Sequence, residues 1–178
     1  RSPSRGLGDV YKRQTLNIDN PKLNCRLEGF SQFSPKRIIL DRNLQIDLKS
    51  YLAKSIKNKN TIIFHNSNDK SKIKLLKKRG TTLIKQSTDK YKNLDLKKIL
   101  KDLYKMEIRN LLVEGGDILT KNFIQKKLFN EFYMFRSSKN LSKNKKHVNF
   151  TSFSILNTKY NKHKICLLYT SPSPRDGL

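Results

Sequence analysis

Residues suited to binding a phosphate gather where an apolar run ends and a helical pattern begins. Leu111–Val113 leads directly into Glu114, Gly115 and Gly116, and the helical pattern starts at Asp117. Paired glycines let the backbone approach a phosphate closely, and the free N–H groups at the start of a helix face an anion. Glu114 would stand at the carboxyl end of a strand, where open α/β sheets bind their ligands. This order of residues predicts a nucleotide site.

A second stretch near the start of the sequence is suited to completing that site. Thr15–Arg26 carries Thr, Asp and Arg side chains in a turn-rich setting. Together the two stretches indicate an enzyme. Asp19–Pro21 also has a simpler interpretation as a turn, because Asp and Asn bond to nearby backbone and Pro fixes φ.

The other ionisable side chains offer weaker chemistry. Glu114 follows an apolar run directly, which is a poor place for a merely solvated carboxylate, so the pattern favours a ligand or an internal partner. Asp117 is expected as an N-cap or first-turn acid rather than a catalyst, although its charge would be unfavourable beside a bound pyrophosphate. His65, His147 and His163 share no spacing with carboxylates or cysteine that indicates metal or nucleophilic catalysis. We therefore expect no metal site in this chain.

These residues must be positioned by a larger framework, and the pattern predicts an α/β fold. Short apolar strands alternate with amphipathic helices, which is typical of a mostly parallel central sheet with flanking helices. The predicted strands are Arg37–Asp41, Thr61–His65, Thr82–Lys85, Ile108–Val113 and Glu131–Phe135, with later strands at Val148–Leu156 and near Ile165. The predicted helices include Leu48, Tyr51, Leu52 and Ile56, then run from Asp69 to Gly80, along Leu96, Ile99, Leu100 and Leu103, and over Asp117–Phe129.

The chain is strongly basic, with 39 Lys and Arg against 14 Asp and Glu and a formal net charge of +25. A clustered basic face would indicate nucleic-acid binding, because neutralising phosphates supplies most non-specific affinity. Here the lysines occur in every predicted helix and loop, together with many Asn and Ile, as an AT-rich coding sequence produces. We therefore favour solvated surface lysines, and keep a basic nucleic-acid-binding module as the non-enzymatic alternative.

Both ends of the sequence are predicted to be foreign. Asp9–Gln14 reads as the translation of a transposase sequencing adapter, and Cys166–Ser171 reads as the reverse complement of the same adapter in a shifted frame. We expect residues 1–14 and 166–178 to be adapter-derived and residues 15–165 to form a single domain. The alternative is a pair of disordered tails rich in Ser, Pro and Arg.

Cysteine content and hydropathy restrict the cellular setting. Cys25 is the one cysteine of residues 15–165, so this region has neither an intrachain disulfide nor a cysteine cluster for zinc. No continuous apolar run approaches the length that spans a bilayer. We expect a cytoplasmic protein with no membrane partner and no specific nucleic-acid partner.

Three ordered signatures resemble one known family. They are Thr15-x-x-x-Asp19-Asn20-Pro21-x-Leu23-x-x-Arg26, the run Arg37–Arg42, and Leu112-Val113-Glu114-Gly115-Gly116-x-x-Leu119, followed by Leu128–Phe132. The chain resembles the reductase domain of the bifunctional riboflavin-biosynthesis deaminase/reductase over residues 15–165. That resemblance implies a dihydrofolate-reductase-like fold. It also implies NADPH-dependent reduction of 5-amino-6-(5-phosphoribosylamino)uracil to the ribitylamino product. The alternative within enzymes is a stand-alone reductase of the same fold with another substrate.

The resemblance also implies roles for individual residues. Its cofactor contacts would be Thr15, Asp19, Gly116, Asp117, Ile118, Leu119, Thr120, Lys121 and Asn122, and its substrate contacts Leu23, Arg26 and Glu114. Arg26 suits a phosphorylated substrate because a guanidinium offers a planar fork. Arg42, just past a strand end, is a further candidate for the cofactor phosphates, with surface solubility as its alternative role. The proton donor stays open, with Glu114 and Asp19 as candidates.

The sequence departs from the family pattern in ways that carry expectations. Asn20 replaces the second Asp of the usual Asp-Asp-Pro, and Lys139–Lys146 replaces a more apolar stretch. The family's first reductase strand and helix would lie upstream of Thr15, as would a zinc-dependent deaminase domain. We expect the full-length enzyme to be a homo-oligomer. The present fragment should be inactive alone, with an apolar groove and unpaired backbone where that strand belongs.

Overall fold

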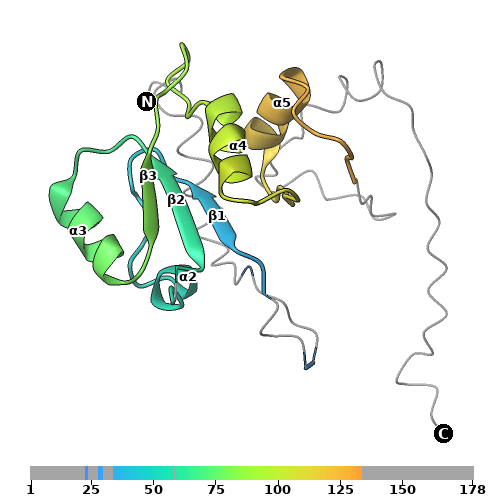
Figure 1. The fold of residues 1–178 in the computed structure, drawn as a ribbon. Helices are drawn as coiled ribbons and strands as arrows, with labels where there is room; N and C mark the ends of the chain where they lie inside the picture. The colour runs from blue at the N-terminus through green and yellow to red at the C-terminus, as the bar shows by residue number, and fades with distance from the viewer. Residues whose placement is uncertain (1–22, 24–27, 30–33, 58, 134–178) are drawn as a thin grey trace, which may run out of the picture.

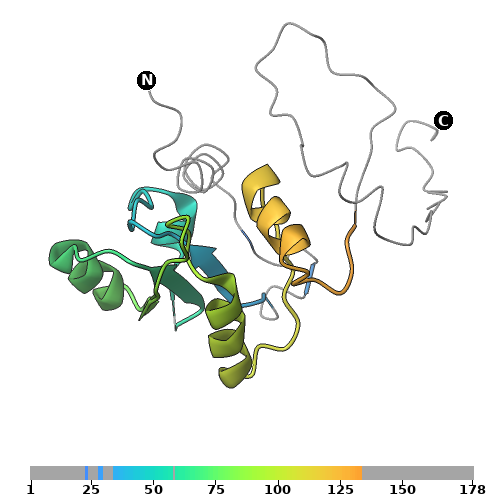
Figure 2. The ribbon, with the colours of Figure 1, turned by 90° about the horizontal axis from the view of Figure 1, so that it is seen from above.

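The computed structural model describes residues 23, 28–29, 34–57 and 59–133 of the 178-residue chain (Figure 1). The predicted strands at Val148–Leu156 and near Ile165 lie outside these residues, as do both predicted adapter-derived ends. Within the described region, helices lie on both faces of a small sheet (Figures 1 and 2). This arrangement confirms the predicted α/β class.

Three parallel strands form the centre of the fold. Strands β1 (Arg37–Leu40), β2 (Thr61–His65) and β3 (Thr82–Lys85) lie in the order β1-β2-β3. All five residues of β2 are buried, because this strand pairs with a neighbour along each edge and is covered on each face. A continuous apolar run is typical of such a strand. All three strands lie where the sequence predicts them, except that β1 ends at Leu40 rather than at Asp41.

One face of the sheet packs against the two earlier helices of the described region. Successive strand residues point to opposite faces, and Ile39 and Ile63 point to this one. The helices are α2 (Tyr51–Lys54) and α3 (Lys70–Lys78), and the latter inserts the fully buried Leu76. Together these side chains form one apolar cluster.

The opposite face packs against the two later helices. These are α4 (Leu96–Lys105) and α5 (Asp117–Gln125), which lie on the same side of the sheet in Figure 2. Ile62 and Phe64 point to this face and join a second apolar cluster with Phe123 of α5. The buried side chains that α4 contributes are Leu96, Ile99 and Leu103.

Capping interactions explain where α3 begins and ends. The Lys72 N–H donates to the Asp69 carboxylate at 2.9 Å, so Asp69 is the predicted N-cap. At the other end the Gly80 N–H donates to the Lys77 carbonyl oxygen at 2.9 Å, and Gly80 adopts φ of 89°. That left-handed conformation is one that glycine adopts at little cost, which confirms the predicted helix end.

Two predicted helices are shorter than the sequence pattern indicates. The helix expected along Leu48–Ile56 is reduced to the four residues of α2. Helix α5 ends at Gln125 rather than Phe129, because Lys126 is its C-cap and Lys127 has a φ of 52°. A left-handed residue ends the helical hydrogen bonding whatever the apolar periodicity that follows.

The predicted strand at Ile108–Val113 is wrong. Within the described region these residues belong to no strand, and the backbone hydrogen bonds outside helices and strands include none from 109–115. Leu112 is 80% exposed, and Leu111 and Val113 are also exposed. A strand requires a neighbouring edge at hydrogen-bonding distance, and a groove separates this segment from β1. The described part of the strand predicted at 131–135, Glu131–Tyr133, is likewise exposed and not a strand.

A histidine buried at the end of the sheet creates a pH-sensitive contribution to stability. His65 is the last residue of β2 and is 3% exposed, and its Nδ1 accepts a hydrogen bond from the Ser67 N–H at 3.2 Å. Burial lowers the pKa of His65, and the nearby positive charge of Lys85 acts in the same direction.

We expect the free energy of unfolding to fall as the pH drops below about 6.5, the ordinary histidine pKa. In that range the unfolded chain takes up a proton that folded His65 does not bind, so acid favours unfolding. His65→Asn removes this contribution and should flatten the dependence between about pH 7 and 5. Urea unfolding of the wild-type protein and the variant at several pH values measures this dependence. His147 and His163 are present in both proteins, so the difference between the two reports on His65. An unchanged slope would contradict this account of His65.

Candidate active site

Helix α5 begins at an open N-terminus that follows Glu114 and the two glycines. Gly116 is the N-cap, with φ of −87° and ψ of −175°, and no side chain provides a cap hydrogen bond. The Thr120 N–H donates to the Gly116 carbonyl oxygen at 3.0 Å. Asp117 is the first helical residue, which confirms its prediction as a first-turn acid. The N-cap residue therefore supplies no side-chain acceptor to the first turn, and backbone N–H groups at a helix start suit an anion.

Gly115 lies close to the first turn of α5. A Cβ atom at position 115 would lie 2.8 Å from Leu119 Cδ2 and 3.1 Å from Leu119 Cβ. Both distances are tighter than ordinary van der Waals contact. The glycine thus lets the segment before α5 pack directly against the helix.

An apolar groove lies beside this helix start. Its volume is about 530 Å³, and it is bounded by β1, α4 and the extended segment Asn110–Glu114. Leu119 and Phe123 of α5 also line it. The groove runs along β1, which is an edge strand of the described sheet. A groove of this size, apolar with a few polar groups at its rim, is typical of a small-molecule site.

The groove brings together two of the three predicted substrate contacts. Leu23 and Glu114 both line it, although they are far apart in sequence. Glu114 is exposed at the rim of the groove, and the ligand or internal partner expected for its carboxylate stays a prediction. The third contact, Arg26, lies outside the described residues, as do Thr15 and Asp19.

Arg42 lies at the carboxyl end of β1 and contacts a loop rather than the groove. Its Nη1 donates to the Lys92 carbonyl oxygen, and its Nε donates to Asn43 Oδ1 at 3.3 Å. The side chain is half-buried. This position places Arg42 at the end of the parallel strands where ligands of open α/β sheets bind.

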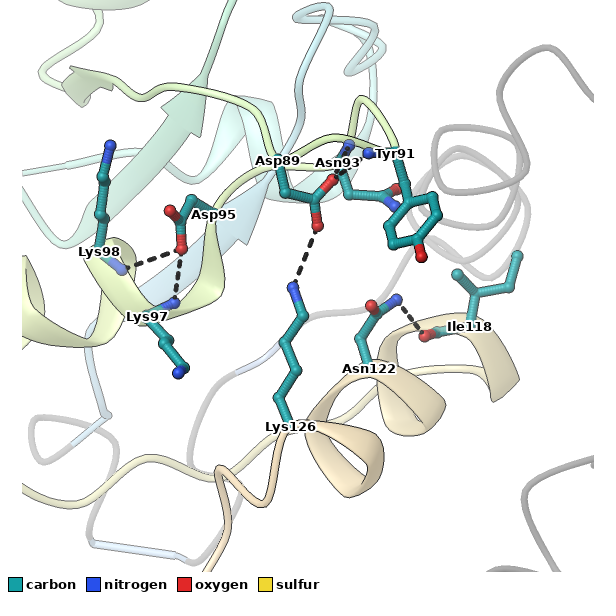
Figure 3. A network of polar contacts seen from close by, with 9 residues as sticks. All are labelled: Asp89, Tyr91, Asn93, Asp95, Lys97, Lys98, Ile118, Asn122 and Lys126. Carbon is teal, nitrogen blue, oxygen red and sulfur yellow. Dashed lines mark hydrogen bonds and ion pairs between the residues drawn. The ribbon is translucent and has the colours of Figure 1, made fainter.

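The predicted cofactor-binding segment on α5 shows a mixed exposure. Lys121 is exposed, whereas the remaining members are half-buried: Gly116, Asp117, Ile118, Leu119, Thr120 and Asn122. The Asn122 amide donates to the Ile118 carbonyl oxygen at 2.9 Å, so one of its donors is used within the helix (Figure 3). The backbone N–H groups of the first turn of α5 are therefore more available to a ligand than the Asn122 amide is.

Two residues of the second family signature have structural roles. The Arg37 guanidinium is buried and donates to Ser55 Oγ at 2.6 Å and to Asn60 Oδ1 at 3.0 Å, and burial lowers its pKa. Asp41 is also buried and accepts a hydrogen bond from the Ile46 N–H at 2.7 Å. These side chains hold β1 to the chain that follows it, so their polar groups are occupied by the protein itself.

Sequence reasoning missed Asp89 and Lys126, which tie the loop before α4 to the end of α5. Lys126 Nζ lies 3.1 Å from Asp89 Oδ2 (Figure 3). Burial acts to raise the pKa of Asp89, but its hydrogen bonds and the lysine outweigh burial and hold the pKa below its usual value. The two residues are 37 positions apart, and nothing in their spacing indicates the contact.

The described residues include neither a metal-ligand cluster nor a membrane-spanning helix. No group of three or more His, Cys, Asp and Glu side chains in that part of the chain is arranged to hold a metal ion. None of its helices has the length and apolar character needed to cross a membrane.

A parallel three-stranded sheet covered by helices defines an α/β domain consistent with a dihydrofolate-reductase-like fold. The chain belongs to the family described as RibD C-terminal domain, whose model matches residues 9–166. This family membership confirms the resemblance found from the three sequence signatures. The adapter origin of residues 1–14 and 166–178 stays a prediction.

Two relatives carry the printed name riboflavin biosynthesis protein RibD. The protein from Actinobacillus pleuropneumoniae is 30% identical over 125 residues, which cover 70% of this chain and 32% of the relative. The protein from Aquifex aeolicus (strain VF5) is 30% identical over 145 residues, covering 76% of this chain and 38% of the relative. The chain thus spans about a third of the length of these curated relatives.

We expect Gly115→Ala to destabilise the protein by about 1–3 kcal/mol, because the added methyl group overpacks against Leu119. Leu119→Ala should remove the 2.8 Å overlap with Leu119 Cδ2 but keep a Cβ atom 3.1 Å from the added methyl group, and it also loses the packing of the Leu119 side chain. The double variant should therefore be more stable than the sum of the two single losses implies. Denaturant unfolding of all four proteins measures the coupling. Strict additivity would contradict the predicted contact.

Proposed function

We propose that this chain is the reductase part of a riboflavin-biosynthesis enzyme. In this proposal NADPH reduces 5-amino-6-(5-phosphoribosylamino)uracil to the ribitylamino product. The observation that carries it is the glycine-marked, uncapped N-terminus of α5 beside an apolar groove, in a chain of the RibD C-terminal family. Both reactants carry phosphate, for which a helix N-terminus and arginine side chains are suitable partners.

Each element has a distinct part in the proposed reaction. The first turn of α5 binds the cofactor pyrophosphate, and Thr15, Asp19 and Arg42 add further cofactor contacts. NADPH supplies the hydride when bound. Leu23 and Glu114 orient the substrate in the groove, where the apolar walls exclude water from the reacting carbon. Arg26 binds the substrate phosphate through its planar guanidinium.

The setting of this reaction follows from the same proposal. The complete enzyme is a cytoplasmic homo-oligomer, and a zinc-dependent deaminase domain, where present, belongs to the rest of the protein. A stand-alone reductase of another substrate is the alternative within enzymes.

The distribution of lysines favours a reductase over a nucleic-acid-binding module. Exposed lysines occur on α3 at one face of the sheet and on α4 at the other. Positive charge on two opposite faces gives no single footprint for a duplex. The proposed function therefore treats these lysines as solvated surface.

Titration of the complete protein with NADPH and with duplex DNA tests the proposal. At roughly physiological salt we expect saturable NADPH binding and only weak DNA binding. NADPH affinity should fall markedly as salt increases, because phosphate contacts are electrostatic. Tight DNA binding without NADPH binding would reverse the assignment.

In the full-length enzyme we expect Arg26→Lys to raise the substrate KM by about tenfold or more while leaving NADPH affinity nearly unchanged. Lysine keeps the charge but lacks the planar fork that grips a phosphate. Arg79→Lys is the matched control, because Arg79 is exposed after α3 and donates to the Leu48 carbonyl oxygen on the other face of the sheet. An equal loss of NADPH affinity would place Arg26 in the cofactor site instead.

A further inference from the structure

The loop between β3 and α4 is closed by a single carboxylate. Asp89 Oδ1 accepts hydrogen bonds from the Tyr91 N–H at 2.9 Å and the Asn93 N–H at 3.0 Å. The Asp89 N–H donates in turn to the Asn93 carbonyl oxygen at 2.7 Å. An antiparallel bridge between Thr88 and Leu94 completes the loop, which Asp89 thereby fixes from within.

The second oxygen of the Asp89 carboxylate forms an ion pair with a lysine at the end of α5. Lys126 Nζ lies 3.1 Å from Asp89 Oδ2, and the side chains are only 29% and 16% exposed for Lys126 and Asp89. Figure 3 shows the lysine extending from the end of α5 toward the loop. An ion pair with so little solvent exposure is screened less than a surface pair. A cation at the C-terminal end of a helix is also favoured by the helix dipole.

The loop is also attached to the core and to Arg42. Leu94 is 2% exposed, and Asp95 caps α4 by accepting from the N–H groups of Lys97 and Lys98. The carbonyl oxygen of Lys92 accepts a hydrogen bond from Arg42. The same loop thus contacts both Arg42, which follows β1, and helix α5.

From this juxtaposition we propose that Asp89 is a positioning residue for the dinucleotide. Through Lys126 it holds α5 at a fixed placement relative to Arg42. The first turn of α5 then meets the pyrophosphate while Arg42 meets the third phosphate, which distinguishes NADPH from NADH. The inference rests on the proposed function for the identity of the ligand. It adds a residue that contacts neither phosphate yet sets the preference between the two dinucleotides.

The geometry explains why a contact at the far end of α5 matters at its start. Lys126 follows a nine-residue helix. At a rise of about 1.5 Å per residue, its ion pair acts about 14 Å from the first turn. A small tilt allowed at one end therefore displaces the other end. Two-point binding of an anionic ligand is sensitive to such displacement, because both contacts must form together.

The test measures dissociation constants for NADPH and NADH in the full-length protein. Lys126→Met removes the ion pair, and Asp89→Asn removes the charge but keeps an oxygen for the Tyr91 and Asn93 N–H groups. We expect the ratio of the NADH to the NADPH dissociation constant to fall by about tenfold in each variant, with NADH affinity nearly unchanged. Lys126→Arg restores a cation and should keep the wild-type ratio. Where Lys126→Met does not fold, Asp89→Asn and Lys126→Gln give the same measurement.

Two controls separate positioning from general stability. Asp69→Ala removes the cap of α3 on the other face of the sheet, so it should lower the melting temperature without changing the ratio. Lys101→Met removes an exposed lysine of α4 and should change neither. If the wild-type protein prefers NADPH and the variants keep its ratio of dissociation constants, the positioning role of Asp89 is overturned. The proposed function is then unaffected. A wild-type protein that binds neither dinucleotide would overturn the proposed function, and this inference with it.

Discussion

The pairing of β2 with a parallel neighbour on each side is the constraint on which the rest of the fold depends. Every residue of this strand is buried, so each of its backbone groups must find a partner in the sheet. Its two neighbours then fix which side chains point to each face. Ile63 joins α2 and α3, whereas Ile62 and Phe64 join α4 and α5. The groove and the open helix start lie beside this framework because α4 and α5 pack on its second face.

Local patterns were sufficient to predict most of this framework. Apolar runs identified the three strands, and Asp69 and Gly80 identified the ends of α3, because capping depends on residues within one turn. The run Ile108–Val113 has the composition of a strand but forms none, because a strand depends on an edge elsewhere in the chain to pair with. Composition reports a preference for extended backbone, and pairing decides whether a strand results.

The candidate site was predictable to a similar extent and for similar reasons. The glycine-to-helix transition is a local signal, and the structure has the uncapped helix start that it predicts. The contact of Asp89 with Lys126 joins the loop before α4 to the end of α5, and nothing in the sequence distinguishes this lysine from the many others. The sequence does not indicate which of the many lysines pairs with Asp89. Only the packing of α5 against the sheet brings this particular pair together.

The short connections within the sheet have a consequence for how the protein is made. Arg37 pairs with Thr61, and Ile62 pairs with Thr82, so each strand joins the next one along the chain. Each pairing closes only the single crossover between consecutive strands, so it costs less loop-closure entropy than pairing strands from distant parts of the chain. Once β3 has left the ribosome, all three strands of the sheet are therefore available to pair. Helix α5 emerges after the three strands, so the candidate site is completed only when this helix packs on the sheet face formed by Ile62 and Phe64.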